Sequence, residues 1–240
     1  NLRAYVLLDV SASMNYRYEA IIARECCKFA LNGSLFRSKK PIHWCCSCNT
    51  ALAEAEIEYH DEASPSVYVK FALADDPAEI DPQLAGRQAS VVIWTTTPWT
   101  LPANLAITLH PDFAYAAVAI ADGEVLIVAR DLVEGCMAAF GITDYRVLAD
   151  LDARDLEKRR CRHPFYDRES LIVLGEHVTL EAGTGCVHTA PGHGREDYDV
   201  GLQYGLEAYS PVNDNGVFTD EVDLFAGQFV FKANDHINQV

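Results

Sequence analysis

Apolar residues recur at helical spacing in three segments of the chain. Between residues 18 and 32 they return every three to four positions, and Gly33 follows where a helix often ends on glycine. We predict a helix over residues 18–32, a second over 195–205, and a short third over 131–140 that stops at Gly141. The remaining patterns are not helical.

Strand-like patterns dominate the rest of the chain. Residues 91–94 form a continuous apolar run of the buried-strand type, and residues 114–120 and 124–129 flank Asp122-Gly123, a strong hairpin signal. We predict further strands over residues 66–73, 145–148, 171–174, 178–180, 210–212 and 228–231. Many short strands with two or three helices predict an α+β fold that is β-rich and barrel-like.

The first 62 residues are organised differently from the rest. Residues 41–48 read as a strand that runs into a tight Cys-x-x-Cys turn, and residues 51–59 lead back out. The acidic, proline-bearing residues 75–87 are predicted to form a surface loop. We therefore predict a junction over residues 1–62, made of a helix and a strand pair, and a larger domain over residues 63–240.

The N-terminal residues and the hydropathy of the chain indicate whether it is a fragment and whether it enters a membrane. The chain does not begin with Met, and we read it as a piece of something longer. Residues 1–14 are predicted to be an extended lead-in and receive no role. No apolar stretch approaches the ~20 residues that a membrane span needs, and no signal peptide is recognisable. We expect no membrane partner.

The net charge of −16 is spread unevenly. Residues 1–60 carry seven Lys and Arg against six acids, whereas residues 61–240 carry twelve against twenty-nine. This balance argues against a broad nucleic-acid face, which is usually basic, so any RNA contact must be local. Within the acidic part there is one basic cluster, at residues 154–162. We predict tRNA contacts at its Lys158, Arg159 and Arg160, although a run of charge is more often a solvated face.

Eight cysteines do not form the pattern of a secreted disulfide scaffold. The pairs Cys26-Cys27 and Cys45-Cys46 are adjacent in sequence, and the chain is long and rich in apolar residues. Reduced thiols in a cytoplasmic protein are therefore expected. Cys45 and Cys48 have the spacing of half a zinc site, but a structural zinc needs four ligands and no second Cys-x-x-Cys is present.

The first segment suited to chemistry is residues 94–104, WTTTPWTLPAN. A buried strand stops at three threonines, and Pro98 and Pro102 prevent a continuing ladder. Hydroxyls and free backbone N–H groups at one strand end suit the binding of a sugar, a carbonyl or a developing oxyanion. The alternative is a polar strand cap with a rigid turn.

The second segment is residues 183–199, GTGCVHTAPGHGREDYD. Its glycines allow close backbone approach, and the predicted helix after it offers N–H groups at its start. His188, His193 and Asp197 are candidates for a metal-dependent hydrolase, but the five-residue spacing of the two histidines fits no standard zinc pattern. Asp197 is also placed to complement the helix dipole.

Together, WTTTPWTLPAN and GTGCVHTAPGHG resemble the editing domain of isoleucyl-tRNA synthetases. Pro98-Trp99-Thr100 favours this member over the valyl and leucyl enzymes, and residues 43–59 resemble the strand pair that joins the editing insertion to the synthetase core. The resemblance covers residues 15–240 and implies a barrel-like editing domain. The two ATP-binding signatures of such enzymes are missing from the chain. It is therefore not expected to charge tRNA by itself.

The resemblance implies hydrolysis of the ester of mischarged valyl-tRNA(Ile) in the cytoplasm. One methylene is too small a difference for a synthetic site to reject valine strongly, and isoleucine against valine is the well-known example of this limit. The implied partners are the tRNA(Ile) 3′ end charged with valine and the remainder of the synthetase polypeptide. No cofactor is implied for editing. A structural zinc is implied only in the full-length enzyme, where a second cysteine pair would complete Cys45 and Cys48.

Site roles follow by motif position. Asp197 would bind the α-ammonium group of the substrate. Thr95, Thr96 and Thr97 would hold the terminal adenosine and the aminoacyl carbonyl. The side-chain pocket and its supporting loop would be formed by His188, Trp99, Asn104, Gly192 and His193. We expect attack by an oriented water, with His188 as general base ranked below its role as a size filter. A non-catalytic module that binds a tRNA end or an amino acid remains the alternative.

Overall fold

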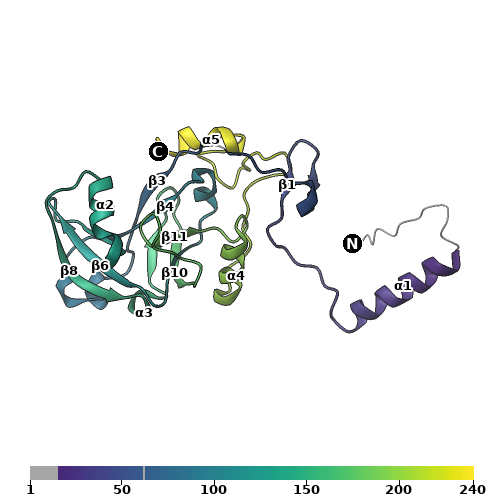
Figure 1. The fold of residues 1–240 in the computed structure, drawn as a ribbon, viewed down its shortest axis with the longest axis horizontal. Coiled ribbons are helices and arrows are strands. Elements are labelled where there is room, and N and C mark those ends of the chain that lie inside the picture. The colour runs from purple at the N-terminus through teal and green to yellow at the C-terminus, as the bar shows by residue number, and fades with distance from the viewer. Residues whose placement is uncertain (1–15, 62) are drawn as a thin grey trace. The chain divides into compact units, whose positions relative to one another are not determined.

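The computed structural model describes residues 16–61 and 63–240, and the chain divides into two units, residues 1–39 and 40–240. In the first unit, α1 spans Tyr16–Leu31 and confirms the predicted N-terminal helix (Figure 1). It ends as expected, because Gly33 adopts φ +81° and the Leu35 N–H donates to the Phe29 carbonyl at 2.9 Å. The predicted lead-in, residues 1–14, lies outside the described residues. The predicted boundary near residue 62 stays a prediction.

The second unit begins with a small hairpin. Strands β1 (Trp44–Cys45) and β2 (Thr50–Ala51) pair antiparallel around the Cys-x-x-Cys turn, where Asn49 adopts φ +51°. Trp44 Nε1 donates to the Asp214 carbonyl at 2.8 Å. A Cβ at Gly216 would lie only 2.6 Å from Cys46 Sγ, so the backbone of this loop approaches the hairpin closely. The hairpin therefore packs on the turn around residues 213–216.

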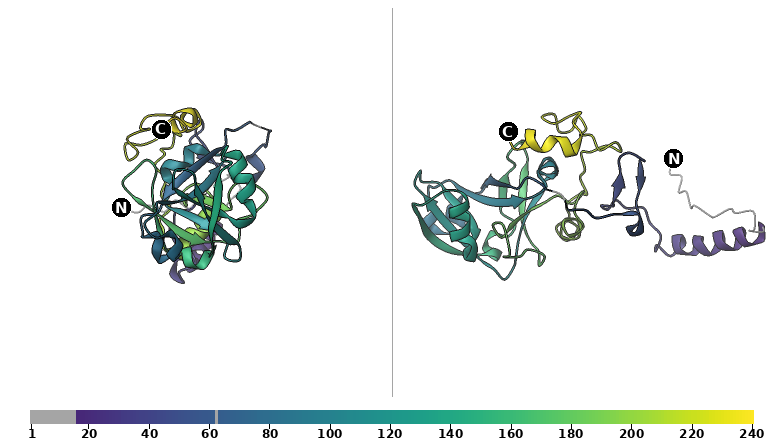
Figure 2. Two further views of the ribbon diagram at one scale, coloured as in Figure 1. Left: turned by 90° about the vertical axis from the view of Figure 1, so that its left-hand side faces the viewer. Right: turned by 45° about the horizontal axis from the view of Figure 1, so that its top comes forward.

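The centre of this unit is a nine-stranded mixed sheet that curves into a half-barrel (Figure 2). Its strands are β3 (Val67–Ala72), β4 (Ala89–Thr95), β5 (Ala106–Leu109), β6 (Ala114–Ile120), β7 (Val125–Ala129), β8 (Tyr145–Asp152), β9 (Arg160–Arg162), β10 (Glu169–Leu174) and β11 (Cys186–Thr189). The order along the sheet is β8-β6-β7-β4-β11-β5-β10-β9, and β3 pairs with β4. A bridge between Leu73 and Cys161 joins the end of β3 to β9. Strands β4, β11, β5, β10, β9 and β3 thus follow one another around the barrel.

The described residues of the second unit also contain four helices and five short 3-10 turns. The helices are α2 (Val133–Ala139), α3 (Ala153–Leu156), α4 (Arg195–Tyr204) and α5 (Val230–Ile237). The 3-10 turns are η1 (Glu54–Glu56), η2 (Pro77–Glu79), η3 (Pro82–Leu84), η4 (Pro98–Ala103) and η5 (Arg130–Leu132). No helix among the described residues is long and apolar enough to cross a membrane.

Both faces of β4 are buried, which explains its continuous apolar run. Val91 and Ile93 belong to the main core, whereas Val92 belongs to a second cluster that includes Val133 and Met137 of α2. A strand covered on both faces has no solvent-facing side, so its sequence does not alternate between apolar and polar residues. The predicted α+β, β-rich, barrel-like fold is confirmed.

Several predicted elements are confirmed and others are wrong. The strands at residues 66–73, 91–94, 145–148 and 171–174, the hairpin at 114–129, and the helices at 131–140 and 195–205 are present with shifted ends. No strand forms over residues 178–180, and residues 210–212 contribute only an isolated bridge at Val212. The segment 75–87 is not an irregular surface loop, because it folds into η2 and η3 and buries Leu84 completely.

The largest correction concerns residues 228–231, predicted as a strand. Helix α5 begins at Val230, and its buried residues are Val230, Ala233 and Ile237. Their spacing of three and four positions is helical, and it becomes visible only when the pattern is followed beyond Phe231. Strands β5, β9 and β11 were not predicted. Of these, β11 lies inside the glycine-rich motif.

Candidate functional site

One strand pairing brings the two sequence motifs together. Strand β11 runs parallel to β4, with Val187 opposite Trp94, and antiparallel to β5, with Thr189 opposite Ala106. Thr95 ends β4, Thr96 and Thr97 follow it, and the turn of residues 190–194 follows β11. Because parallel strands end at the same edge of a sheet, the motifs become neighbours although about ninety residues separate them in sequence.

The threonines form the bend between β4 and η4. Thr95 Oγ1 accepts a hydrogen bond from the Thr97 N–H at 3.0 Å, and Thr100 Oγ1 donates to the Thr97 carbonyl at 2.8 Å. Thr96 is exposed, whereas Thr95 and Thr97 are half-buried. Pro98 begins η4, where a missing N–H is tolerated. The bend therefore presents hydroxyl groups on a backbone that its own hydrogen bonds hold.

His188 is buried behind this bend and joins the two motifs. Asn104 Nδ2 lies 2.8 Å from His188 Nδ1, and Thr100 Oγ1 lies 2.9 Å from His188 Nε2. The amide nitrogen can only donate, so Nδ1 accepts and the ring proton sits on Nε2, which donates to Thr100. Burial lowers the pKa of His188 to about 3. The imidazole is neutral and both its nitrogens are occupied, which leaves no free nitrogen for a general base.

Asn104 is the hub of the same network and is completely buried. Its Nδ2 also donates to the Ala106 carbonyl at 2.8 Å, and its Oδ1 accepts from Ser170 Oγ at 2.7 Å. It thus connects η4 with β5, β10 and β11. This geometry fits the supporting role predicted for Asn104, and Ser170, which was not predicted, belongs to the same network.

Asp197 lies in the first turn of α4, under the glycine-rich turn. Its Oδ2 accepts a hydrogen bond from the Ala190 N–H at 2.8 Å. Burial is the main influence on its carboxyl and raises the pKa of Asp197 to about 6. A Cβ at Gly194 would lie 2.8 Å from the Asp197 carboxyl carbon, so only glycine leaves room here. Similarly, a Cβ at Gly192 would meet the Tyr209 carbonyl, which explains the glycine predicted in the site.

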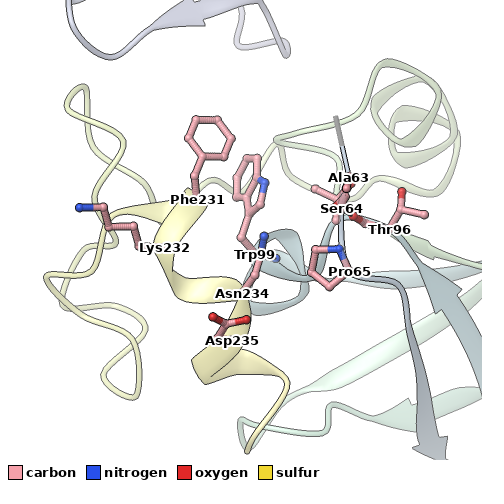
Figure 3. Close-up of a pocket in the computed structure, with 10 residues that line it drawn as sticks. Ala63, Ser64, Pro65, Thr96, Trp99, Phe231, Lys232, Asn234 and Asp235 are labelled. Atoms are coloured by element: carbon pink, nitrogen blue, oxygen red, sulfur yellow. Dashed lines mark hydrogen bonds between the residues drawn. The ribbon is translucent and has the colours of Figure 1, made fainter. Parts of the chain in front are cut away.

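Aromatic rings connect the glycine-rich turn to the surface. The ring of Trp99 meets His193 edge to face at 5.0 Å and Phe231 of α5 at 6.0 Å between centroids. Burial lowers the pKa of His193 to about 4, and its buried Nε2 has no hydrogen-bond partner among the described residues. Beside Trp99 lies a groove of about 600 Å³, which we call the α5 groove; it is lined by Ser64, Thr96, Trp99, Phe231, Lys232 and Asn234 among others (Figure 3).

Two further residues hold η4 from its far side, and sequence reasoning missed both. His163 Nε2 donates to the Leu101 carbonyl at 3.0 Å, and Arg168 Nη2 donates to the Pro102 carbonyl. The Arg168 guanidinium also lies over the rings of Tyr166 and Tyr209. These residues are about sixty positions or more from η4 in sequence, so no local pattern predicts that they bind its carbonyl groups.

The predicted tRNA contacts lie outside this site. Arg159 pairs with Glu79, and Arg160 pairs with Asp75 at 2.8 Å and with Glu169 at 3.2 Å. These carboxylates neutralise the positive charges of Arg159 and Arg160, on which the predicted RNA contact was based. None of the ion pairs found among the described residues involves Lys158. Contact of this cluster with tRNA stays a prediction.

Cys45 and Cys48 form a turn of the kind found in metal sites. The Cys48 N–H donates to Cys45 Sγ at 3.4 Å, and such bonds lower the pKa of the Cys45 thiol. Over residues 16–61 and 63–240, no group of three or more His, Cys, Asp or Glu side chains is placed to hold a metal ion. The pair is thus half a site within this part of the chain. The same finding removes the geometric basis for a metal hydrolase built on His188, His193 and Asp197.

Comparison with known proteins decides the family. A family model described as tRNA synthetases class I (I, L, M and V) matches residues 9–232. The chain belongs to this family. Isoleucine–tRNA ligases of Desulfotalea psychrophila and Geobacter sulfurreducens are 55% and 57% identical to it over 229 and 222 residues, which are 95% and 92% of the chain. The isoleucyl resemblance predicted from the two motifs is confirmed. The chain spans 24% of the length of each of these synthetases.

Solved structures with the same fold include two leucyl-tRNA synthetase editing domains. GlLeuRS-CP1 superimposes with a TM-score of 0.58 at 17% identity, over 73% of this chain and 94% of that one. The editing domain of the P. knowlesi cytosolic leucyl-tRNA synthetase gives a TM-score of 0.57 at 10% identity, over 72% and 91% of the two chains. At these identities the likeness concerns the fold. The chain therefore has the fold of a synthetase editing domain.

Proposed function

We propose that this chain is the editing region of an isoleucyl-tRNA synthetase and that it hydrolyses the ester of mischarged valyl-tRNA(Ile). The observation that carries the proposal is Asp197, a partly desolvated carboxylate beside the point where the two motifs meet. Family membership and the editing-domain fold support it. Cytoplasmic action follows from the same assignment.

Asp197 is suited to bind the α-ammonium group of the aminoacyl ester. With a pKa of about 6 it is mostly ionised at pH 7, and an arriving ammonium group would favour the charged form further. Its Oδ2 is held by the Ala190 N–H, so the carboxylate has a fixed orientation. A charge fixed in partly desolvated surroundings binds an opposite charge more strongly than one in water.

The threonine bend would bind the other end of the ester. Its hydroxyls are donors for the carbonyl oxygen and the terminal ribose, because Thr95 Oγ1 accepts a bond within the bend and keeps its own hydrogen to donate. Trp99 and His193, in edge contact, would form the apolar wall that admits valine. His188 would shape this wall from behind, because its own hydrogen bonds are already made.

No activated nucleophile is found among the described residues of the site. Cys186 is buried, and burial raises its pKa well above the ordinary value, so it stays a thiol. His188 has no free nitrogen. Catalysis would therefore consist of holding the ester against an oriented water, and the rate would come mainly from positioning.

The zinc half-site would be completed elsewhere. Cys45 and Cys48 present two thiols on a preformed turn, and the other ligands would come from the remainder of the synthetase polypeptide. This zinc would support the junction and would play no part in hydrolysis.

Single-turnover deacylation tests the function. With the chain in excess over substrate, valyl-tRNA(Ile) should be hydrolysed much faster than isoleucyl-tRNA(Ile). Asp197→Asn should reduce the rate by ~100-fold or more, since the ammonium group loses its charge partner. Asp199→Asn, at an exposed position of the same helix, is the matched control and should act like the unmodified chain. Equal hydrolysis of both tRNAs, or none, would refute the proposal, and binding without hydrolysis would indicate a binding module.

A further inference from the structure

The α5 groove lies where a nucleotide chain would leave the proposed site. Thr96 and Thr97 belong both to the threonine bend and to the groove wall, so the two are continuous. If the terminal nucleotide sits at the bend, the nucleotides before it need an exit. The groove volume of about 600 Å³ is in the range of pockets for small organic ligands. It therefore has room for one or two nucleotides.

The groove presents an unusual apolar surface. Phe231 is 64% exposed on α5 and meets Trp99 nearly at right angles, at 82°. Figure 3 shows the two rings side by side at the top of the groove. Phe229 extends the row of rings, with its centroid 5.4 Å from that of Phe231. Exposed rings offer stacking surfaces for bases, and proteins that bind single strands use them without reading sequence.

Polar groups in the groove match a ribose-phosphate chain. Lys232 supplies one cation in a part of the chain where acids outnumber Lys and Arg by more than two to one. Asp235 and the Thr96 hydroxyl can accept hydrogen bonds from ribose hydroxyls. A contact with a single phosphate needs no broad basic face, so it is compatible with the net charge of −16.

The walls of the groove are fixed by hydrogen bonds. Asn234 Oδ1 accepts from the Trp99 N–H at 3.0 Å and ties α5 to η4. Ser64 Oγ donates to the Thr96 carbonyl at 2.5 Å and ties the segment before β3 to the threonine bend. A preformed groove loses little conformational entropy on binding.

We propose that the α5 groove binds the single-stranded nucleotides that precede the terminal adenosine of tRNA, with a base stacked on Phe231 and a phosphate at Lys232. This proposal rests on the proposed function, since it takes the terminal nucleotide to lie at the threonine bend. It assigns α5 a role in substrate binding that is separate from the reaction at Asp197.

Fluorescence anisotropy with the whole chain tests the proposal. The probe is a 5′-labelled RNA pentanucleotide that ends in cytidine-cytidine-adenosine, and unlabelled adenosine monophosphate is the competitor. Phe231→Ala should weaken binding of the pentanucleotide about tenfold, within the range for loss of one stacked base, and should leave competition by adenosine monophosphate unchanged. Leu202→Ala, which removes a 59% exposed apolar side chain from α4, is the matched control and should have no effect.

The salt dependence tests the phosphate contact. Lys232→Gln should lower the slope of log K against log salt by about 0.7, the value for one phosphate of a single strand. The control is Lys70→Gln, which removes a lysine of β3 that is paired with Glu124. This variant should leave the slope unchanged.

The outcomes separate this proposal from the proposed function. Asp197→Asn should reduce hydrolysis by ~100-fold or more and retain pentanucleotide binding. If valyl-tRNA is hydrolysed but Phe231→Ala and Lys232→Gln bind the pentanucleotide normally, the groove proposal is overturned. If the two variants weaken binding as described but no hydrolysis occurs, the groove proposal stands and the editing function fails.

Discussion

At the residue scale, Asp197 shows how burial and charge are balanced in this site. Its carboxyl is shielded by the glycine-rich turn, and bonds from backbone N–H groups offset the lost hydration only in part. The pKa consequently lies near 6 rather than at its ordinary value of 3.8. A buried carboxylate with few hydrogen bonds is stabilised strongly when a cation binds beside it. The same burial of the charged form lowers the free energy of unfolding, so tight binding and lower stability have one cause.

The first prediction concerns the pH dependence of deacylation. The rate constant kcat/KM should fall tenfold per pH unit below about pH 6, because protonation of Asp197 removes the charge that binds the ammonium group. The measurement is hydrolysis of valyl-tRNA between pH 5 and pH 8. A profile that stays flat down to pH 5 would contradict a role for the ionised carboxylate.

The second prediction concerns stability at the same residue. Between about pH 4 and pH 6 the folded protein binds the Asp197 proton more tightly than the unfolded chain does, so the cost of its charge appears as the pH rises through this window and is complete above pH 6. Asp197→Asn should therefore raise the free energy of unfolding by about 1 kcal/mol at pH 7.5 and leave it nearly unchanged at pH 4. Urea unfolding of both proteins at the two pH values measures this, and an equal effect at both would speak against a titrating cause.

The third prediction concerns the buried network around His188. Asn104→Ala should lower the free energy of unfolding by about 2–3 kcal/mol, because it leaves His188 Nδ1 and Ser170 Oγ without partners in the core. The kcat of deacylation should also fall, since the His188 ring loses the hydrogen bond from Asn104 that fixes its orientation. Asn215→Ala, in an exposed turn, serves as the control. No loss of stability in Asn104→Ala would mean that the network is not formed as described.

At the element scale, η4 is a short segment held on several sides. Thr100 faces His188, Asn234 of α5 binds the Trp99 N–H, and His163 and Arg168 bind carbonyls from the far side. Two prolines restrict its backbone further, at Pro98 and Pro102. This 3-10 segment carries Trp99 into the site, so elements distant in sequence fix the geometry of the pocket wall.

The fourth prediction tests this support. Arg168→Ala should lower kcat for deacylation by about tenfold with little change in KM, because η4 loses a charge-assisted bond to the Pro102 carbonyl while the binding groups stay present. Arg168→Lys should recover part of the rate. Arg130→Ala, whose exposed guanidinium pairs with Asp150, is the control and should keep the full rate. Equal loss in both alanine variants would indicate a general effect of charge.

At the scale of the whole molecule, the hairpin β1–β2 of the predicted junction lies in the same compact unit as the sheet. The hairpin β1–β2 packs on the turn around residues 213–216, through Trp44 and Cys46. Nothing in residues 41–59 predicts this contact, because its partner lies about 170 positions away. The unit division falls at Lys39 and Lys40.

The fifth prediction compares two truncations. A chain of residues 40–240 should unfold at the same Tm as the full chain, whereas residues 63–240 should unfold several degrees lower. The loss of the Trp44 contact with Asp214 and of the packing at Gly216, about 1–2 kcal/mol, corresponds to roughly 2–8 °C. Calorimetry measures both. Equal Tm values would favour the boundary near residue 62.

Local periodicity determined much of this protein from the sequence alone. The helix α1, the hairpin β6–β7 and the buried strand β4 follow from patterns within a few turns or strands of chain. The two motifs also sufficed to indicate the family. Local spacing is enough to predict a helix, a hairpin or a strand, because the pattern of apolar residues that marks each of them lies within that segment.

Only the tertiary structure decided how these parts meet. The pairing of Val187 with Trp94 makes the motifs neighbours, the burial of His188 makes it a neutral link, and ion pairs with Glu79 and Asp75 neutralise Arg159 and Arg160. Helix α5 supplies one wall of a groove whose other walls come from residues 63–65 and 96–99. Each outcome depends on a partner dozens of positions away, and no single segment encodes the identity of its distant neighbour.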